Sequence, residues 1–196
     1  MQKEKSIFSN VSDEELMLHI CAGEVGAFDE IYKRYAKRLL GYFIRMLNYD
    51  KCLAEDALQD IFVKLAEFPD KFDGSRQFKT WIFSIASNHC KNIYRHKCVV
   101  AECHEELGYL FNSSESNSFT AIASKIDAGE FRTLLDEALK GLPRERKEAF
   151  ILRFQEDKSI SEIAHIQNCP EGSVKSRLHY TIKILEEKLQ MFNPVI

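Results

Sequence analysis

The sequence predicts an all-helical (all-α) protein of two small domains joined by a flexible linker. Apolar residues recur at steps of three and four, the spacing of one face of an α-helix, whereas strand-like alternation is scarce. Only 8 Gly and 4 Pro are present, and 45% of the residues are hydrophobic, which is enough for packed cores. We expect residues 1–97 to form the first domain, residues 98–128 the linker and residues 129–196 the second domain, with four helices in each domain.

Four helical segments are predicted in the first domain. Ser12 and Glu15 have the spacing of a capping box, and a short helix follows them. The next helix is long and amphipathic, and its apolar face comprises Phe28, Ile31, Tyr32, Tyr35, Leu39, Phe43 and Met46. A third helix covers about residues 52–67. The fourth runs from about residue 77 to Lys97, after a turn-rich stretch that reads PDKFDGSR.

Residues 98–127 interrupt the helical periodicity. They are acidic and contain the polar run NSSESNS, a composition typical of a partly disordered linker, with a single apolar patch at residues 107–111. Beyond them we predict a helix closed by Gly141, a helix over about 143–155, and a short helix opened by a second capping box, Ser159 with Glu162. The last helix covers about 171–191, with a buried stripe of Val174, Leu178, Ile182, Leu185 and Leu189.

Charge is segregated along the chain, although the formal net charge is only −3. Residues 71–97 contain six Lys or Arg against one acid, Asp73. Residues 50–60 contain four acids against Lys51 alone. Separate acidic and basic faces indicate two different kinds of partner.

The second domain contains the pattern of a helix-turn-helix. A short helix and a longer one, basic near its start, flank a tight turn at residues 168–172, and the first turns of such a second helix enter the major groove of DNA. The candidate DNA contacts are Ser173, Lys175, Ser176, Arg177, His179, Tyr180 and Lys183. Val174 and Leu178 should point into the domain. An ordinary helical hairpin with a solvated basic face would give the same pattern.

Three sequence stretches resemble a known family. SISEIAHIQNCPEGSVKSRLHYTIKILEEKL resembles region four of the extracytoplasmic-function (ECF) sigma factors of bacterial RNA polymerase. AEDALQDIFVKLAEF and FKTWIFSIASNHCKNIYRHK resemble their region two. The stretches occur in the family order and, with their surroundings, cover about residues 13–97 and 131–189. The resemblance implies a protein that binds core polymerase and directs promoter recognition, promoter melting and transcription initiation.

The resemblance assigns a different partner to each half of region two. The acidic helix of region two binds the clamp helices of the largest polymerase subunit, and the matching positions here are Asp56, Gln59, Asp60, Phe62 and Leu65. The fourth helix and the loop before it correspond to the part that opens and reads the −10 element. The candidate residues there are Phe72, Lys79, Thr80, Trp81, Ser84, Ser87, Asn88, Lys91 and Arg95. Asn88 and Lys91 are the preferred contacts, since Trp81 lies on the apolar side of its helix.

Region four reads the −35 element in this family, and this chain departs from the family at three positions. Lys175 stands where Arg is common, and His179 and Tyr180 stand where Phe-Arg is common. Lysine presents a point charge instead of a bidentate fork, so the −35 sequence that is read should differ. The resemblance also implies binding of region four to the flap of the second polymerase subunit, and an anti-sigma factor, which in this family is often membrane-bound.

Three other classes of protein share parts of this sequence pattern. A helix-turn-helix repressor or response regulator would need a ligand-binding or receiver domain, and no such pattern is present. A metal or redox sensor is suggested by His89, Cys90, His96, Cys98, Cys103 and His104, but paired C-x-x-C spacing is missing, so no metal site is predicted. No phosphate loop or nucleophile elbow is present, so we expect no enzymatic activity, no cofactor and no small-molecule substrate.

The expected location is the cytoplasm. Residues 1–10 are polar and charged, no apolar run is long enough to cross a bilayer, and the 6 Cys are expected to be free thiols. A membrane-bound anti-sigma factor would hold the protein at the inner membrane.

Overall fold

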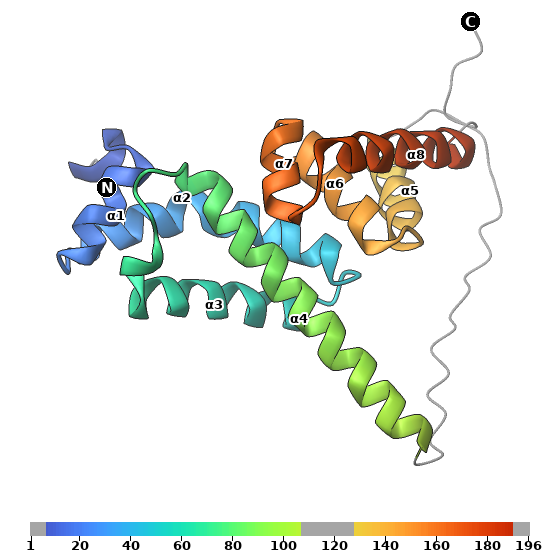
Figure 1. Cartoon of the computed structure of the whole chain (residues 1–196), viewed down its shortest axis with the longest axis horizontal. Coiled ribbons are helices and arrows are strands. Elements are labelled where there is room, and N and C mark those ends of the chain that lie inside the picture. The colour runs from blue at the N-terminus through green and yellow to red at the C-terminus, as the bar shows by residue number, and fades with distance from the viewer. Residues whose placement is uncertain (1–6, 107–127, 190–196) are drawn as a thin grey trace, which may run out of the picture.

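The structure, a computed structural model, describes residues 7–106 and 128–189 and is helical throughout those ranges (Figure 1). Two short 3-10 helices, η1 (Ile7–Asn10) and η2 (Pro69–Lys71), accompany eight α-helices. The all-helical fold predicted from the spacing of apolar residues is confirmed. None of the helices in the described ranges is long and apolar enough to cross a membrane.

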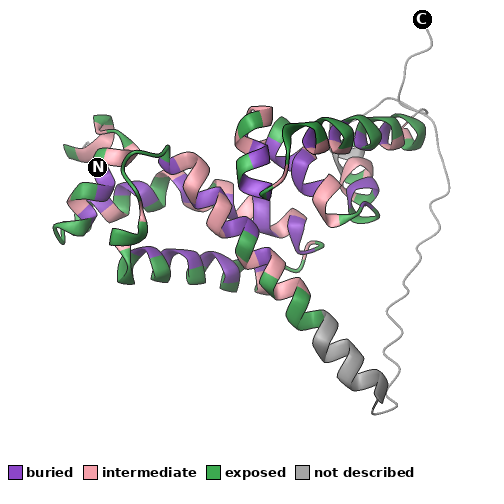
Figure 2. Ribbon diagram, viewed as in Figure 1, coloured by how far each residue is buried: buried purple, intermediate pink, exposed green. Residues whose placement is uncertain are grey.

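The N-terminal half consists of α1 (Asp13–Cys21), α2 (Val25–Met46), α3 (Lys51–Glu67) and α4 (Phe78–Glu106). The predicted capping box is present at α1, where the Ser12 hydroxyl accepts from the backbone N–H of Glu15 and the Glu15 carboxylate accepts from that of Ser12. The predicted face of α2 is largely buried against α1 and α3, although Tyr32 is 47% exposed (Figure 2).

Helix α4 is longer than the sequence predicted. It continues past Lys97 to Glu106, so the first nine residues assigned to the linker, 98–106, are helical. This stretch contains no Gly or Pro, and Ala and Glu are good helix formers, so nothing in it stops the preceding helix. The apolar patch at residues 107–111 and the polar run after it lie outside the described residues.

The C-terminal half consists of α5 (Ala128–Lys140), α6 (Arg144–Phe154), α7 (Ile160–Gln167) and α8 (Glu171–Leu189). The second predicted capping box is present at α7, between Ser159 and Glu162. Asn168 then adopts a left-handed conformation (φ 52°) that ends α7 and turns the chain into α8. The helix-turn-helix therefore consists of α7, this turn and α8.

The buried stripe of α8 differs from the prediction at Ile182 and at Leu189, which is only half-buried. Val174, Leu178 and Leu185 are buried as predicted, but Ile182 is 37% exposed and Thr181 is fully buried in its place. Consecutive steps of four drift off one helix face, because a helix has 3.6 residues per turn, and a step of three corrects the drift. Thr181 is therefore the residue that faces the core.

The two halves pack against each other. Helix α7 lies against α4, and α5 and α6 lie against α2 (Figure 1). One continuous apolar cluster includes α2–α4 residues such as Phe83 together with Ala149, Ile151 and Ile163 of the C-terminal half. A second, smaller cluster of Ala138, Leu139, Leu142 and Leu185 lies within the C-terminal half. Spacing along the sequence did not predict this association.

Candidate functional site

The first turns of α8 present a polar face to solvent. Lys175, Ser176, His179 and Tyr180 are all exposed, as is Lys183 one turn further on, and Ser173 is half-buried. Val174 and Leu178 on the opposite side are 0% and 8% exposed and fix the helix on the domain. Helix α8 lies on the side of the molecule away from α3 (Figure 1), and its first turns present these side chains to solvent.

Arg177 is turned toward the protein instead of toward solvent. Its guanidinium donates to the Gln167 side-chain oxygen at 2.6 Å and to the Cys169 sulfur at 3.1 Å. The Gln167 amide in turn donates to the Glu148 carboxylate at 3.0 Å, and Tyr42 donates to the same carboxylate at 2.7 Å. The structure thus places this predicted DNA contact in a hydrogen-bonded chain that holds the turn between α7 and α8.

Arg146 was missed by the sequence reasoning and lies beside the exposed face of α8. Its guanidinium carbon lies 5.3 Å from the centre of the Tyr180 ring, and that ring in turn lies 5.5 Å from the ring of His179. A cation over an aromatic face is a favourable contact that orients both groups. No local pattern in α6 indicates this position, because the contact forms only when α6 and α8 pack together.

The acidic face of α3 is exposed for three of its five predicted residues. Asp56, Gln59 and Asp60 are exposed, whereas Phe62 and Leu65 are only 5% and 3% exposed. Phe62 packs against the rings of Phe28 and Tyr32 of α2. The two apolar residues therefore hold α3 in the core and leave the polar three at the surface.

Asp60 also links α3 to α4. One of its carboxylate oxygens lies 3.4 Å from Nε2 of His89, a residue whose side chain is mostly buried. Burial and the nearby Lys64 lower the pKa of His89, and Asp60 opposes this effect only in part. Asp56 has no such partner among the contacts of the described residues. Of the two carboxylates, that of Asp56 is therefore the more available for contact with another protein.

An aromatic cluster joins the loop after α3 to the start of α4. The rings of Phe72, Phe78 and Trp81 lie 5.1 to 5.7 Å apart in pairs. Phe78 is fully buried, whereas Phe72 and Trp81 are half-buried. The buried ring thus anchors two rings that each keep one edge accessible.

The polar −10 candidates divide between the surface and the core. Asn88 and Arg95 are exposed, and Lys79, Thr80, Ser84 and Lys91 are half-buried. Ser87 is fully buried, so the structure places it in the packed side of α4 and away from any ligand at the surface. The Asn88 amide oxygen accepts from Lys91 at 3.5 Å, and the two preferred residues thus lie together.

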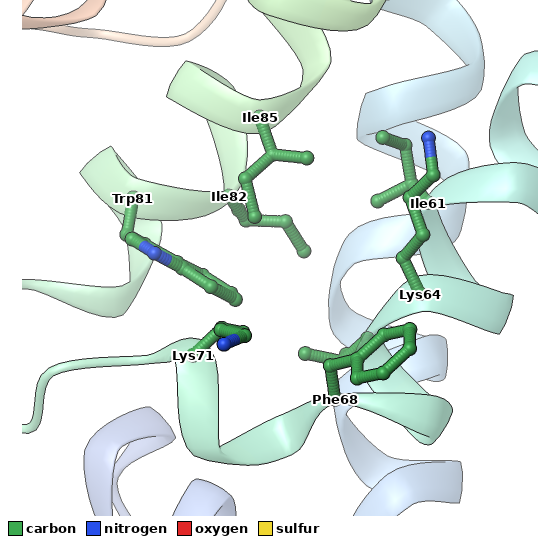
Figure 3. A pocket seen from close by; sticks show the side chains of 8 residues that line it. Ile61, Lys64, Phe68, Lys71, Trp81, Ile82 and Ile85 are labelled. Atoms are coloured by element: carbon green, nitrogen blue, oxygen red, sulfur yellow. The ribbon is translucent and has the colours of Figure 1, made fainter.

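Two hollows flank Trp81. An apolar pocket of about 370 Å³ lies between α3 and α4, and its lining is shown in Figure 3: Ile61, Lys64, Leu65, Phe68, Lys71, Trp81, Ile82 and Ile85. A more polar cleft of about 660 Å³ lies between α4 and α7. Its α4 side includes Thr80, Ser84 and Asn88, and its α7 side includes Glu162 and His165.

Among the residues that the structure describes, no three His, Cys, Asp or Glu side chains gather closely enough to hold a metal ion. In the Cys/His cluster at residues 89–104, Cys90 is fully buried and His96 is exposed. The side chains of Cys98, Cys103 and His104 lie outside the described set.

Comparison with known proteins identifies both halves. The family model described as "Sigma-70 region 2" matches residues 31–97, and the model "Sigma-70, region 4" matches residues 132–183. The chain is 29% identical to the RNA polymerase sigma-H factor of Pseudomonas aeruginosa over 91% of this chain and 94% of that protein. It is 26% identical to the ECF RNA polymerase sigma-E factor of Haemophilus influenzae over 92% of this chain and 96% of that protein.

Solved structures show the same fold. The sigma factor RpoE of Bartonella quintana, in complex with the anti-sigma factor NepR, is similar with a TM-score of 0.63 and 26% identity, over 83% of this chain and 96% of that one. CnrH, in complex with the cytosolic domain of CnrY, is similar in fold with a TM-score of 0.65 and 20% identity, over 91% and 97% of the two chains. The chain belongs to the ECF sigma factors, with a region 2 in its N-terminal half and a region 4 in its C-terminal half, and it directs RNA polymerase in promoter recognition and transcription initiation.

Proposed function

We propose a division of this activity among three exposed faces. The exposed face of α8 reads the −35 element, the polar face of α3 binds the clamp helices of the largest polymerase subunit, and α4 with its preceding loop opens and reads the −10 element. The observation that carries the proposal is that each face lies on a different helix fixed by a buried apolar side. Rigid helices place contacting groups more reproducibly than loops do.

At the −35 element, Lys175 and His179 are the central base contacts, with Ser173, Ser176, Tyr180 and Lys183 around them. Arg177 supports these residues through the turn, because its Nη1 donates to both Gln167 and Cys169. Arg146 adds a positive charge beside Tyr180 and is placed to meet a phosphate.

Replacing Lys175 or His179 by alanine should weaken binding to a −35 duplex by roughly 1–3 kcal/mol each. Both side chains are exposed and reach from the first turns of α8, so the loss comes from missing DNA contacts and not from unfolding. Fluorescence anisotropy with a labelled duplex measures it. Lys188→Ala, which removes the same charge near the far end of α8, is the matched control and should leave the affinity nearly unchanged. Equal affinity for all variants would exclude α8 as the −35 reader.

At the −10 element, Asn88, Lys91 and Arg95 form the polar and basic side of α4, while Phe72 and Trp81 offer ring edges beside them. Unpaired bases bind to such surfaces by stacking on rings while cations follow the backbone. Thr80 and Ser84 extend the same face toward the start of the helix, whereas Lys79, nine residues before Asn88, lies on the other side of α4 with its charge near Glu156.

Replacing Asp56 by alanine should lower the affinity for core polymerase while leaving the thermal unfolding midpoint within a degree or two, since exposed substitutions change stability little. Glu187 is also an exposed acid on a helix but lies on α8 of the other region, so Glu187→Ala is the control. Competition for core polymerase against labelled wild-type protein reports the difference. If both variants compete equally well, the acidic face does not contact polymerase.

Two further partners complete the proposal. Phe154 (53% exposed) and Ile182 (37% exposed) are apolar side chains at the surface of region 4, and they are the residues we assign to the polymerase flap. An anti-sigma factor is the expected regulator, because the sigma factor RpoE of Bartonella quintana, which is similar to this chain, was solved in complex with the anti-sigma factor NepR. If that factor is membrane-bound, the complex is held at the inner membrane.

A further inference from the structure

We propose that region 4 packs on region 2 and thereby blocks only the binding of the −10 strand, a contact that we call the lock. In this closed arrangement the chain can still bind polymerase and a −35 duplex. It then opens to bind the −10 strand. The inference rests on the proposed function of α4. It is carried by side-chain contacts between the two regions and by the three faces that those contacts cover or leave exposed.

Charged and polar side chains join the two regions along α2. Arg38 donates to Glu156 through Nε at 2.9 Å and through Nη2 at 2.6 Å. Further along α2, the Tyr42 hydroxyl donates to Glu148 at 2.7 Å. Both acids are buried, at 6% and 2% exposure. A buried carboxylate needs partners of this kind, so these two acids favour the closed arrangement.

A second set of contacts engages the start of α4. The Thr80 hydroxyl donates to a Glu162 carboxylate oxygen at 2.9 Å. Lys158, which is 0% exposed, donates to both, at 3.2 Å to the Thr80 oxygen and 3.0 Å to the same Glu162 oxygen. One of the −10 candidates is therefore already hydrogen-bonded to region 4.

Three more of the −10 candidates, Trp81, Ser84 and Asn88, face region 4 across the polar cleft of about 660 Å³. Ser84 and Asn88 line one wall, and Ser161, Glu162 and His165 of α7 line the other. A strand lying along α4 would have to share this cleft with α7. The closed arrangement thus opposes a DNA strand by limiting the space along α4.

The other two faces stay accessible in the same arrangement. Lys175 and His179 of α8 are exposed, and so are Asp56 and Gln59 of α3. Region 4 covers neither face, because it rests on α2 and α4. Packing of region 4 on region 2 therefore restricts access to the −10 surface of α4 and leaves the −35 and polymerase-binding faces accessible.

The chemistry of the interface suits reversible opening. Burial raises the pKa of Glu156, with Arg38 opposing, which indicates that desolvation of this acid is costly even when it is paired. On opening, Arg38 and Glu156 regain water, and this gain offsets much of the lost attraction. Polar interfaces between domains of one chain are typical of domains that move relative to each other.

Reciprocal charge reversal tests the lock on the full-length chain. Arg38→Glu and Glu156→Arg each place like charges opposite one another, and the double variant restores an opposite pair with its orientation exchanged. The probes are a single-stranded oligonucleotide carrying the −10 element, and a −35 duplex, both from a promoter that the wild-type holoenzyme transcribes. Small-angle X-ray scattering of the free proteins reports whether the two regions separate.

Each single variant should expand the free protein and raise its affinity for the −10 strand by roughly tenfold. The reason is that only the open molecules bind the strand, so the fraction of open molecules limits the apparent affinity. The double variant should return both quantities toward wild type, which a mere change of net charge would not do. The affinity for the −35 duplex should change less than twofold throughout (about the scatter of such measurements), because α8 is exposed in either form.

Three results would overturn the lock. The first is an expanded single variant that binds the −10 strand no better than wild type, and the second is a pair of single variants that stay compact. Equal gains for the −10 strand and the −35 duplex would show a general charge effect and would also overturn it. If the wild-type holoenzyme fails to bind the −10 strand through α4, as judged by an unchanged affinity in Asn88→Ala, the proposed −10 function itself fails, which is a separate outcome.

Discussion

Replacing Phe83 by alanine is expected to lower the free energy of unfolding by about 3–5 kcal/mol, the range for deletion of a fully buried aromatic ring. Phe83 is 0% exposed and lies edge-on to Tyr42 at 5.6 Å. The guanidinium of Arg38 and the ammonium of Lys158 also lie over its ring, at 5.9 and 5.7 Å. The ring thus supports residues of both regions at once.

Urea denaturation followed by circular dichroism measures this loss. Phe68→Ala is the control, because Phe68 is an aromatic residue of region 2 that is 51% exposed. Its removal should cost about 1 kcal/mol or less, since little buried surface is lost. If the two variants were equally destabilised, the position of Phe83 at the centre of the association between the regions would be contradicted.

Replacing Glu162 by alanine should destabilise the protein by about 2–4 kcal/mol, because two roles end together. Glu162 closes the capping box of α7 by accepting from the Ser159 backbone N–H at 2.8 Å. It also neutralises Lys158, whose side chain is fully buried and whose pKa is lowered by burial. Without the carboxylate, a buried ammonium loses its counter-charge.

The chain contains its own control for this prediction. Glu15 closes an equivalent capping box on α1, by accepting from the Ser12 backbone N–H at 3.1 Å, but no buried lysine depends on it. Glu15→Ala should therefore be clearly milder than Glu162→Ala in the same denaturation assay. Similar losses in the two variants would show that capping alone explains Glu162.

Low pH should reduce the free energy of unfolding through protonation of Glu162. Burial opposes ionisation of Glu162, but hydrogen bonds from Ser159, Lys158 and Thr80 outweigh it and lower the pKa to about 2. A carboxyl whose pKa is lower in the folded state stabilises the fold fully above its unfolded pKa, about 4.3, and loses that contribution as the pH falls toward 2. Glu162→Gln should accordingly flatten the stability profile across that interval.

Local sequence patterns located the helices of the described ranges, although not the full length of α4, and they oriented the first turns of α8. Two capping boxes, Ser12 with Glu15 and Ser159 with Glu162, marked helix starts correctly because they depend on residues three apart. Val174 and Leu178 marked the inner face of α8 by the same logic. The resemblance to ECF sigma factors added the family, which no spacing alone could supply.

Contacts between distant residues were beyond such patterns. Arg38 and Glu156 are 118 positions apart, and nothing near either of them indicates the other. Arg177 was assigned to DNA because basic residues at the start of a recognition helix commonly reach it, but the neighbouring turn supplies two acceptors that hold it. Ser87 was placed on the polar side of α4, whereas packing of α2 against α4 buries it.

The continuous apolar cluster has a consequence for how the chain melts. Because Phe83 of region 2 and Ile151 and Ile163 of region 4 belong to one cluster, heating should disrupt both regions in a single cooperative event while they remain associated. When the two regions are separated, the stability of each region depends on its own core alone. Region 4 then relies on a short set of residues around Leu139 and Leu185 and on the remainder of its share of the large cluster. The shape of the heat-unfolding curve therefore depends on the fraction of molecules in which the two regions are separated.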